Sequence, residues 1–317
     1  MQFDRLDLNL LVALDVLLRE KNVSVAAERV HISQSAMSGA LSRLREYFED
    51  DLLVSSGRKM VLTARGQSLV EPVRNALLQI RLTITSKPVF EPANSDRKVR
   101  LLASDFMIRI AICRALRAIA AEAPNMLFDL VALESEPWEW LERGDVDLLV
   151  NAEQYVSPHH PTTLLFKEDY VVVGWADNPH FGAQIDMETY VKLGHVTVFH
   201  GKGRHATYSE WYSRVTKVAH HVEVVAPSFS DVPYLLVGTN RIATMHRRLA
   251  EMVCKVLPLK VAPVPFKIPK INMVAQWHSV NAKDPALAWV VSHLKEACRE
   301  WTDDRQRSIV TSDQRSL

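Results

Sequence analysis

Residues 32–45 read ISQSAMSGALSRLR, and this stretch decides the fold of the first part of the chain. Ser33 has a side-chain oxygen that can cap the first turn of a helix, and the pattern predicts that this helix runs to about Phe48. Its apolar residues recur with helical spacing and form one stripe, made of Ala36, Ala40, Leu41, Leu44 and Phe48. Five polar residues lie largely off that stripe: Gln34, Ser35, Ser38, Ser42 and Arg45. The sequence therefore predicts an amphipathic helix with a polar beginning.

Two further helices are predicted before it. Residues 8–19 carry leucines at helical spacing, and a break at residues 22–24 makes Ser24 the expected N-cap of a short helix over residues 25–30. A short turn separates this helix from the one that follows Ser33. Two helices joined in this way, the second polar at its start, are typical of a helix-turn-helix.

The residues that follow predict a hairpin and then a long helix. Residues 52–54 and 60–62 are short strand-like runs around a basic tip, as in the wing of a winged helix-turn-helix. Thr63 can cap the fourth helix, which Pro72 should bend, and its apolar stripe consists of Leu69, Val73, Leu77, Ile80 and Ile84. Because no segment of the chain obviously covers this stripe, we expect a partner helix to do so. Residues 87–95 have the composition of a hinge.

From residue 99 onward, strands and helices alternate. Strands are predicted at residues 99–103, 127–133, 146–150, 164–174, 196–199, 222–225, 241–244 and 273–278, and helices at 107–121, 138–143 and 286–299. Such alternation predicts parallel sheets covered by helices. The expected boundaries are a DNA-binding-type domain over 1–66, a linker helix and hinge over 67–94, a larger domain over 95–305, and a disordered tail over 306–317. Within the larger domain we expect subdomain I at about 95–167 and 271–305, and subdomain II at about 168–270.

Composition limits the possible functions. Residues 1–66 contain nine basic and nine acidic residues, so DNA binding has to be argued from their placement. We expect a cytosolic protein, because no apolar run is long enough to span a bilayer and the first residues do not form a signal peptide. Cys113, Cys254 and Cys298 lie far apart, without the spacing of a metal site. No cofactor is expected, and the sequence lacks a nucleophile motif or a complete phosphate loop at residues 201–203.

The pattern resembles the LysR family of bacterial transcription regulators. The resemblance rests on residues 6–11 (LDLNLL), 24–27 (SVAA), 32–38 (ISQSAMS), 41–45 (LSRLR), 62–63 (LT), 143–149 (RGDVDLL), 169–174 (DYVVVG), Trp277 and Asp284-Pro285. It implies a winged helix-turn-helix domain followed by an α/β effector-binding domain made of two Rossmann-like subdomains, as in periplasmic binding proteins. The branch of nodulation and aromatic-degradation regulators is the most similar. Gly39 is unfavourable inside a recognition helix, because glycine in a helix lowers stability by about 1 kcal/mol relative to alanine.

The resemblance implies a set of DNA contacts. At the start of a recognition helix, Gln34, Ser35 and Ser38 could hydrogen-bond to base edges. Arginine and lysine are better suited to phosphates. The expected DNA-contacting residues are Ser33, Gln34, Ser35, Ser38, Ser42, Arg43, Arg45, Arg58 and Lys59. The alternative is that the serines only cap helices and that the arginines pair with Glu46 or Asp50.

Effector contacts are expected just after the strands, because ligands of α/β sheets bind at the carboxyl ends of strands. The expected residues are Ser104, Asp105, Asn151, Phe199, His200, Gly201, Phe229 and His246. An aromatic ligand would need an apolar slot with a few directed polar groups, which this set could supply. Alternatively, the two phenylalanines belong to the core and His200 lies on a surface loop.

The function implied by the resemblance is a non-enzymatic regulator. It would bind double-stranded promoter DNA as a homotetramer, contact RNA polymerase, and activate transcription in response to a phenolic, flavonoid or chlorinated aromatic inducer. Three alternatives stay open: a repressor or inducer-independent regulator of the same fold, an enzyme with a structural helical head, and a solute-binding protein.

Overall fold

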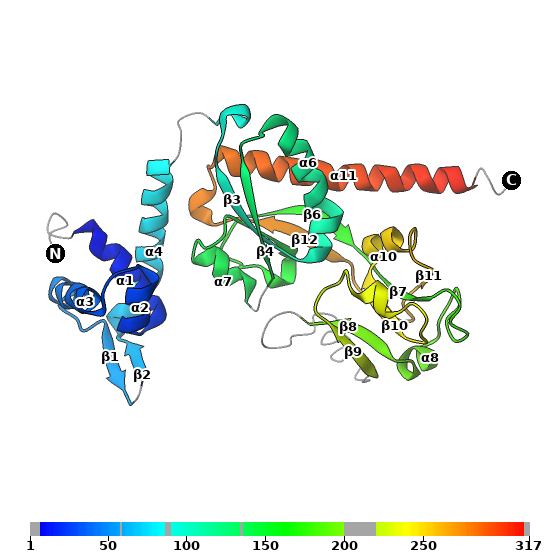
Figure 1. The fold of residues 1–317 in the computed structure, drawn as a ribbon, viewed down its shortest axis with the longest axis horizontal. Coiled ribbons are helices and arrows are strands. Elements are labelled where there is room, and N and C mark those ends of the chain that lie inside the picture. Colours follow the sequence, from blue (N-terminus) through cyan, green and yellow to red (C-terminus); the bar gives the residue numbers. More distant parts are fainter. Residues whose placement is uncertain (1–6, 58, 86–89, 134–135, 200–219, 314–317) are drawn as a thin grey trace. The chain divides into compact units, whose positions relative to one another are not determined.

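The computed structural model describes residues 7–57, 59–85, 90–133, 136–199 and 220–313. The chain divides into two compact units, residues 1–88 and 89–317, and each is described by itself (Figure 1). The first unit consists of helices α1 (Leu8–Glu20), α2 (Val23–Arg29) and α3 (Gln34–Phe48), strands β1 (Leu53–Ser56) and β2 (Lys59–Leu62), and helix α4 (Ala64–Thr85).

Side-chain caps set the starts of the helices in this unit. Ser33 caps α3 as predicted, since its hydroxyl oxygen accepts the Ala36 N–H at 3.1 Å. The prediction that Ser24 caps α2 is wrong. The carboxamide oxygen of Asn22 accepts the N–H groups of Ser24 and Val25 at 2.9 and 3.2 Å, so α2 begins two residues earlier than expected.

The predicted hairpin is present and joins directly to α4. β1 and β2 pair antiparallel, with Ser56 opposite Lys59, and Gly57 at the turn has a φ of 62°. The Thr63 hydroxyl caps α4 by accepting the Gly66 N–H at 2.9 Å. Gly66 packs so closely against the Leu52 carbonyl group that a Cβ atom would overlap the carbonyl oxygen.

The apolar stripe of α4 is covered largely from within the chain, which corrects the expectation that it lacks an internal partner. Leu69, Val73 and Leu77 belong to the core that α1 forms with α3, and Val73 is buried. Ile80 and Ile84 remain exposed, with 36% and 78% of their surface accessible. Only this second half of the stripe is therefore available to a partner.

The second unit contains two five-stranded sheets (Figure 1). The first has the order β4-β3-β5-β12-β6 and is built from β3 (Lys98–Ala103), β4 (Leu127–Ala132), β5 (Leu148–Ala152), β6 (Thr162–Glu168) and β12 (Ile271–Gln276). The second has the order β11-β7-β10-β8-β9 and is built from β7 (Tyr170–Trp175), β8 (His195–Val198), β9 (Val222–Ala226), β10 (Ile242–His246) and β11 (Leu259–Ala262).

Both sheets are mixed, so the prediction of parallel sheets holds for some of their strand pairs and not for others. In the first sheet β3 runs parallel to β4 and β5, but β12 runs antiparallel to β5 and β6. In the second, β8 is parallel to β9 and β10, whereas β7 is antiparallel to β10 and β11. The single strand expected over residues 164–174 is in fact two strands, β6 and β7, which belong to different sheets.

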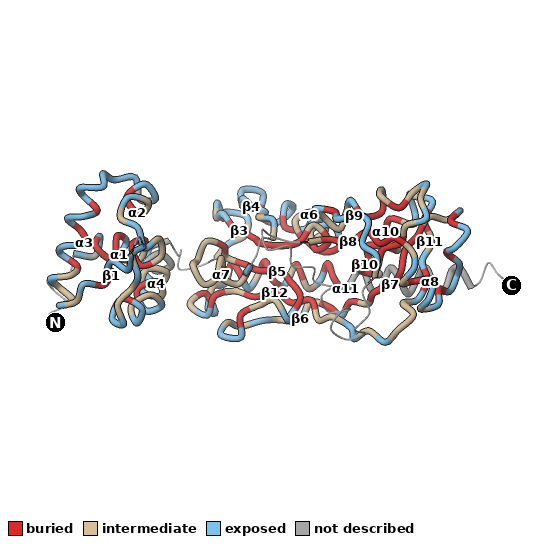
Figure 2. Tube along the Cα trace, turned by 90° about the horizontal axis from the view of Figure 1, so that it is seen from below, coloured by how far each residue is buried: buried red, intermediate tan, exposed pale blue. Residues whose placement is uncertain are grey.

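Helices pack on these sheets. They are α5 (Asp105–Met107), which continues through a π turn (Ile108–Ile112) into α6 (Cys113–Glu122), then α7 (Pro137–Glu142), α8 (Met187–Lys192), α10 (Arg247–Val253) and α11 (Pro285–Asp313). Single 3-10 turns span Pro92–Asn94, Glu153–Tyr155, Val232–Leu235 and Ser279–Asn281. α11 packs against α6 and continues to Asp313, in place of the disordered tail expected from residue 306. Strands of both sheets contribute to one buried core, which is red in Figure 2.

Candidate functional site

The first candidate site is the exposed face of α3. Met37, Ala40, Leu41 and Leu44 are buried against the rest of the unit. The polar residues at the start and middle of the helix are exposed, as the sequence pattern indicated: Gln34, Ser35, Ser38, Ser42 and Arg43. Hydrogen-bonding groups therefore face outward from the first three turns of α3.

Two of the serines contact each other at the beginning of this face. The hydroxyl groups of Ser33 and Ser35 lie 2.9 Å apart. Ser33 also accepts the Ala36 N–H, so one lone pair of its oxygen is used by the helix cap. The hydrogen bond with Ser33 therefore orients the Ser35 hydroxyl group.

Arg45 has an internal role that the sequence did not indicate. Its Nε donates to the carbonyl oxygen of Asp51 at 2.8 Å, and its Nη2 donates to that of Leu53 at 2.7 Å. The side chain thus joins the end of α3 to β1. These hydrogen bonds are made to backbone carbonyl groups, and not to the Asp50 or Glu46 carboxylates of the alternative interpretation.

The other expected basic contacts lie apart from Arg45. Arg43 is exposed on α3 and has no hydrogen-bond or ion-pair partner among the described residues. Lys59 is exposed at the start of β2. Arg58 lies outside the described residues. Arg43 and Lys59 are thus exposed cations of the expected set among the residues that the structure describes.

The Asp50 carboxylate organises the link from α3 to the hairpin and α4. It accepts the Leu52 N–H at 2.7 Å and the Thr63 hydroxyl at 2.6 Å. These two donors stabilise the ionised form and lower the pKa of Asp50. Together with Arg45, they hold the hairpin against the helix that carries the exposed polar face.

The second candidate site lies where β3 and β10 end, beside the loop after β9. Asp105 follows β3, and its carboxylate accepts the backbone N–H groups of Phe229 at 3.2 Å and Ser230 at 2.7 Å. The Arg109 Nε donates to the Ser230 hydroxyl at 2.6 Å. Ser104 is buried and caps α5 by accepting the Met107 N–H at 3.3 Å. The two sheets are thus connected by hydrogen bonds at this edge.

Aromatic rings gather beside these hydrogen bonds. His246, at the end of β10, stacks on Phe106 with ring centres 4.0 Å apart and an angle of 9° between the planes. Phe229 contacts both rings edge-on, at 6.4 Å from Phe106 and 4.7 Å from His246. Sequence reasoning missed Phe106, although it directly follows the expected Ser104 and Asp105. The Phe106–Phe229–His246 group is called the aromatic cluster below.

Two other expected effector residues, Asn151 and Phe199, make none of the contacts given above. Asn151 is a buried residue of β5, paired with Val274 of β12, and its side-chain oxygen accepts the adjacent Ala152 N–H. Phe199 is half-buried after β8. His200 and Gly201 lie outside the described residues.

A buried ion pair lies where β6 ends and the chain continues into β7. The Arg248 Nη1 donates to the Glu168 carboxylate at 2.7 Å, and the Arg248 guanidinium lies 4.1 Å from the centre of the Phe166 ring. Loss of hydration raises the pKa of Glu168, and Arg248 opposes that rise. Because an unpaired charge is costly in such a place, each partner requires the other.

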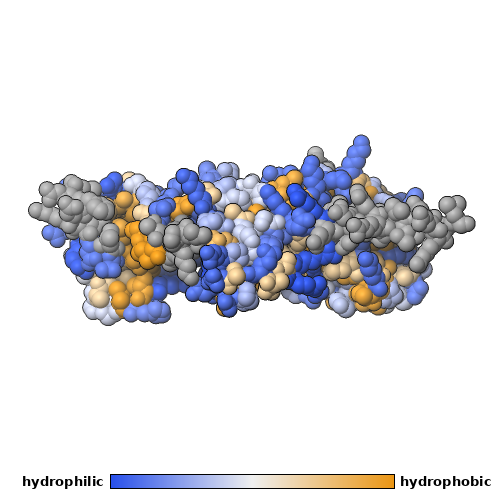
Figure 3. Space-filling view, turned by 90° about the horizontal axis from the view of Figure 1, so that it is seen from above, coloured by the Kyte–Doolittle hydropathy of each residue, from blue (hydrophilic) through white to orange (hydrophobic). Residues whose placement is uncertain are grey.

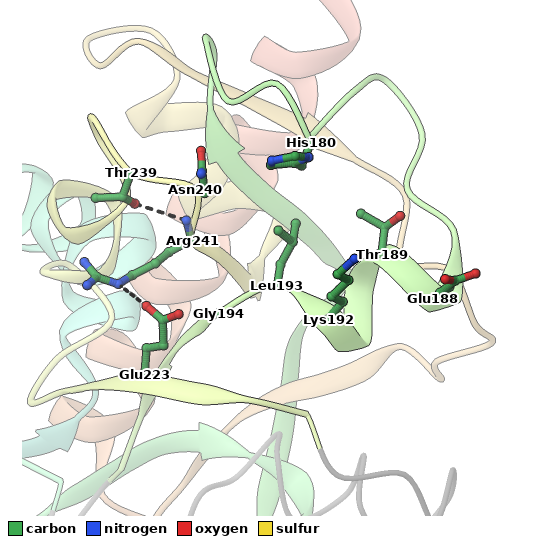
Figure 4. A pocket seen from close by; sticks show the side chains of 10 residues that line it. All are labelled: His180, Glu188, Thr189, Lys192, Leu193, Gly194, Glu223, Thr239, Asn240 and Arg241. Carbon is green, nitrogen blue, oxygen red and sulfur yellow. Dashed lines mark hydrogen bonds and ion pairs between the residues drawn. The ribbon is translucent and has the colours of Figure 1, made fainter.

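A separate pocket of about 460 Å³ lies at the opposite ends of β8 and β10 (Figure 4). Its lining is mostly polar, and it includes Arg241, which donates to the Glu223 carboxylate at 2.8 Å. Two of the residues that Figure 4 labels, Gly194 and Arg241, come directly before β8 and β10, whereas the expected effector residues follow strands. The pocket does not coincide with the predicted effector edge and lacks the aromatic lining expected there.

Three further features concern the described residues as a whole. No helix formed by these residues combines the length and the apolar character needed to cross a bilayer. Nor do they contain a group of three or more side chains placed to hold a metal ion. On the face shown in Figure 3, hydrophobic side chains form separate small areas between hydrophilic ones.

Comparison with known families covers both units. A model described as a bacterial regulatory helix-turn-helix protein of the lysR family matches residues 8–67. A model described as the LysR substrate binding domain matches residues 93–299. The first match contains all of α3 and the hairpin, and the second contains both five-stranded sheets.

Individual relatives cover nearly the full chain. Nodulation protein D 1 of Bradyrhizobium japonicum is 41% identical over 317 residues, with 99% of this chain and 98% of the relative covered. Nodulation protein D 1 of Sinorhizobium fredii is 42% identical over 301 residues, with coverages of 94% and 93%.

Solved structures have the same fold. A probable transcriptional regulator from Pseudomonas aeruginosa has a TM-score of 0.63 at 27% identity, covering 92% of this chain and 97% of that one. Full-length OxyR from the same organism has a TM-score of 0.64 at 18% identity, with coverages of 93% and 95%.

Proposed function

The chain belongs to the LysR family of bacterial transcription regulators, and from this we propose that it is a cytosolic activator that binds promoter DNA through α3 and responds to a small aromatic inducer. The observation that carries the proposal is the exposed polar face of α3 within the segment matched by the helix-turn-helix model. In a helix-turn-helix, the N-terminal part of the second helix enters the major groove.

The side chains of α3 and of the hairpin suit two kinds of DNA contact, to bases and to phosphates. The Gln34 carboxamide can pair with N6 and N7 of adenine, and the hydroxyls of Ser35 and Ser38 can donate to or accept from several bases. Arg43 and Lys59 carry exposed charges that suit phosphates, which position a protein without reading sequence. Ser33 and Ser42 complete the proposed contact set, and Arg45 supports it from within.

We propose that the protein acts as an oligomer, a dimer of dimers. The exposed Ile80 and Ile84 at the end of α4 offer an apolar strip to the same helix of a second copy. Two recognition helices could then reach successive major grooves of a two-fold symmetric site. Activation would include contact with RNA polymerase.

The proposed inducer site is the edge formed by Ser104, Asp105 and the aromatic cluster. Flat rings there can stack on an aromatic ligand, and the adjacent hydroxyl and carboxylate can orient its polar groups. The hydrogen bonds that the Asp105 carboxylate accepts from residues 229–230 cross between the two sheets, so a ligand that changes them changes how the sheets are joined. Such a ligand acts only if it binds one arrangement more tightly than the other.

DNA footprinting with the purified full chain tests the proposal. DNA flanking its own gene should be protected, and the protection should change when hydroxylated or chlorinated aromatics are added. Affinity should fall steeply with salt, because contacts to phosphates release counterions. Unchanged protection and unchanged transcription across the whole aromatic panel would remove the sensing role and leave an inducer-independent regulator. An absence of protection at low salt would remove the regulator itself.

A further inference from the structure

Gly39 lies in the middle of α3, on its exposed face, and the fold does not explain it. Apart from the adjacent residues and the backbone of α3 itself, no atom of the described residues would lie within 4 Å of a Cβ at this position, and Gly39 is not among the residues with a positive φ. Two other glycines of the same unit differ in this respect. Gly57 has a positive φ, and a Cβ on Gly66 would overlap the carbonyl group of Leu52. At Gly39, by contrast, alanine would fit without any rearrangement.

Glycine at this position also weakens the helix. It loses more backbone entropy on folding than alanine does, which makes it a poor residue for a helix interior. In the part of the chain that the structure describes, neither packing nor a turn compensates for that cost at Gly39. A molecule that contacts α3 from outside could compensate for it, if it needs the space that a methyl group would fill.

The major groove of DNA sets such a requirement. A helix with its side chains is about 10–12 Å across, and the groove is roughly 12 Å wide. Gly39 follows Ser35 by one helical turn and precedes Ser42 by almost one, so the three share the face proposed to enter the groove. At this point the helix presents only a Cα atom and can approach the base edges more closely than at its neighbours.

We propose that Gly39 is the point where α3 comes closest to the bases and that the C5-methyl group of a thymine packs against its Cα atom. A glycine inside a helix has no side-chain donor or acceptor, and its backbone groups are used by the helix, so the contact has to be apolar. The thymine methyl is the apolar group in the major groove. The inference rests on the proposed function and adds a residue that determines sequence specificity.

The test pairs a methyl group added to the protein with one removed from the DNA. The parent chain is first used to select binding sites from a pool of random-sequence duplexes. Each thymine of a selected site is then replaced in turn by uracil, which lacks only the methyl group. Gly39→Ala should bind the selected duplex about tenfold more weakly than the parent, and uracil at one position should restore its affinity to within about threefold.

Two controls separate this effect from folding. Gly39→Ala should unfold at the same temperature as the parent or a higher one, because alanine favours a helix. Ser68→Ala, on the exposed surface of α4, makes a similar helix-favouring change and should leave DNA affinity unchanged.

Three results would overturn the inference: equal binding by parent and Gly39→Ala, weaker binding that no uracil position restores, or a lower unfolding temperature of the variant. If the parent selects no site from the pool, the proposed function itself fails, which is a distinct outcome.

Discussion

The carboxylate of Asp105, after β3 of the first sheet, accepts the backbone N–H of Ser230, after β9 of the second sheet, at 2.7 Å. The same carboxylate accepts a hydrogen bond from the Phe229 N–H, and Arg109 donates to the Ser230 hydroxyl. A charged acceptor thus connects two sheets whose strands come from distant parts of the sequence. The contact lies beside the aromatic cluster, so it links the stability of the second unit to the proposed inducer site.

Replacing Asp105 with alanine should lower the free energy of unfolding of the second unit by roughly 1.5–3 kcal/mol, the range for hydrogen bonds to a charged group. Urea unfolding of the full chain provides the measurement. Asp231→Ala is the matched control, because Asp231 is exposed and, among the described residues, its carboxylate accepts from Ser228 of its own loop and not from the other sheet. Equal losses in the two variants would show that Asp105 does not join the sheets.

Arg43 and Arg45 should differ in what their loss affects, although only one residue separates them. Arg45→Ala removes the hydrogen bonds to Asp51 and Leu53 and should cost roughly 1–2 kcal/mol in unfolding free energy. Arg43→Ala should leave stability unchanged, weaken binding to all DNA sequences alike, and reduce the slope of log affinity against log salt by about 1. Thermal unfolding and a salt titration of DNA affinity compare the two variants. A reversed pattern would contradict both assignments.

Gln34→Ala should relax sequence preference at one base position by about 1–3 kcal/mol, because a bidentate contact to adenine is lost. Affinities for a set of single-base operator variants, measured for parent and mutant, give this difference. Gln34 does not read a base if both proteins rank all variants identically.

The free energy of unfolding should fall as the pH is lowered from 6.5 to 4, because His195 is buried. Burial lowers the pKa of this side chain from 6.5 to about 4, while its Nε2 lies 2.6 Å from the Tyr190 carbonyl oxygen. In this pH range the unfolded chain binds a proton that the folded chain rejects, so the stability present above pH 6.5 is lost as the pH approaches 4. Unfolding temperatures across the range should fall less for His195→Gln than for the parent. The exposed His221→Gln is the control and should follow the parent.

The first unit was largely predictable from the sequence, because its helices are set by neighbouring residues. Ser33 caps α3 and Thr63 caps α4 at the expected positions. The start of α2 was missed, since Asn22 and Ser24 are both good caps and only the observed hydrogen bonds distinguish them. The internal role of Arg45 depends on the position of the hairpin carbonyl groups, which side-chain patterns do not reveal.

The second unit was less predictable, because its pairing joins distant segments. An apolar run gives no sign that the chain changes sheets at Asp169, nor that β12 returns antiparallel. Four of the expected effector residues gather near Phe106, namely Ser104, Asp105, Phe229 and His246. Asn151 follows the same strand-end rule, yet it makes its side-chain hydrogen bond to the next residue. The rule points to one edge of a sheet, but it does not say which side chains meet there.

The chain crosses from one sheet to the other twice, at Asp169 and again between Ala262 and Ile271. The lobe that contains the first sheet is therefore built from two separate lengths of polypeptide, and the lobe that contains the second sheet, although continuous, is attached at both of its ends. A protease that cuts one crossing leaves the lobes covalently connected through the other. A gene truncated before β12 would encode a first lobe that lacks one of its inner strands.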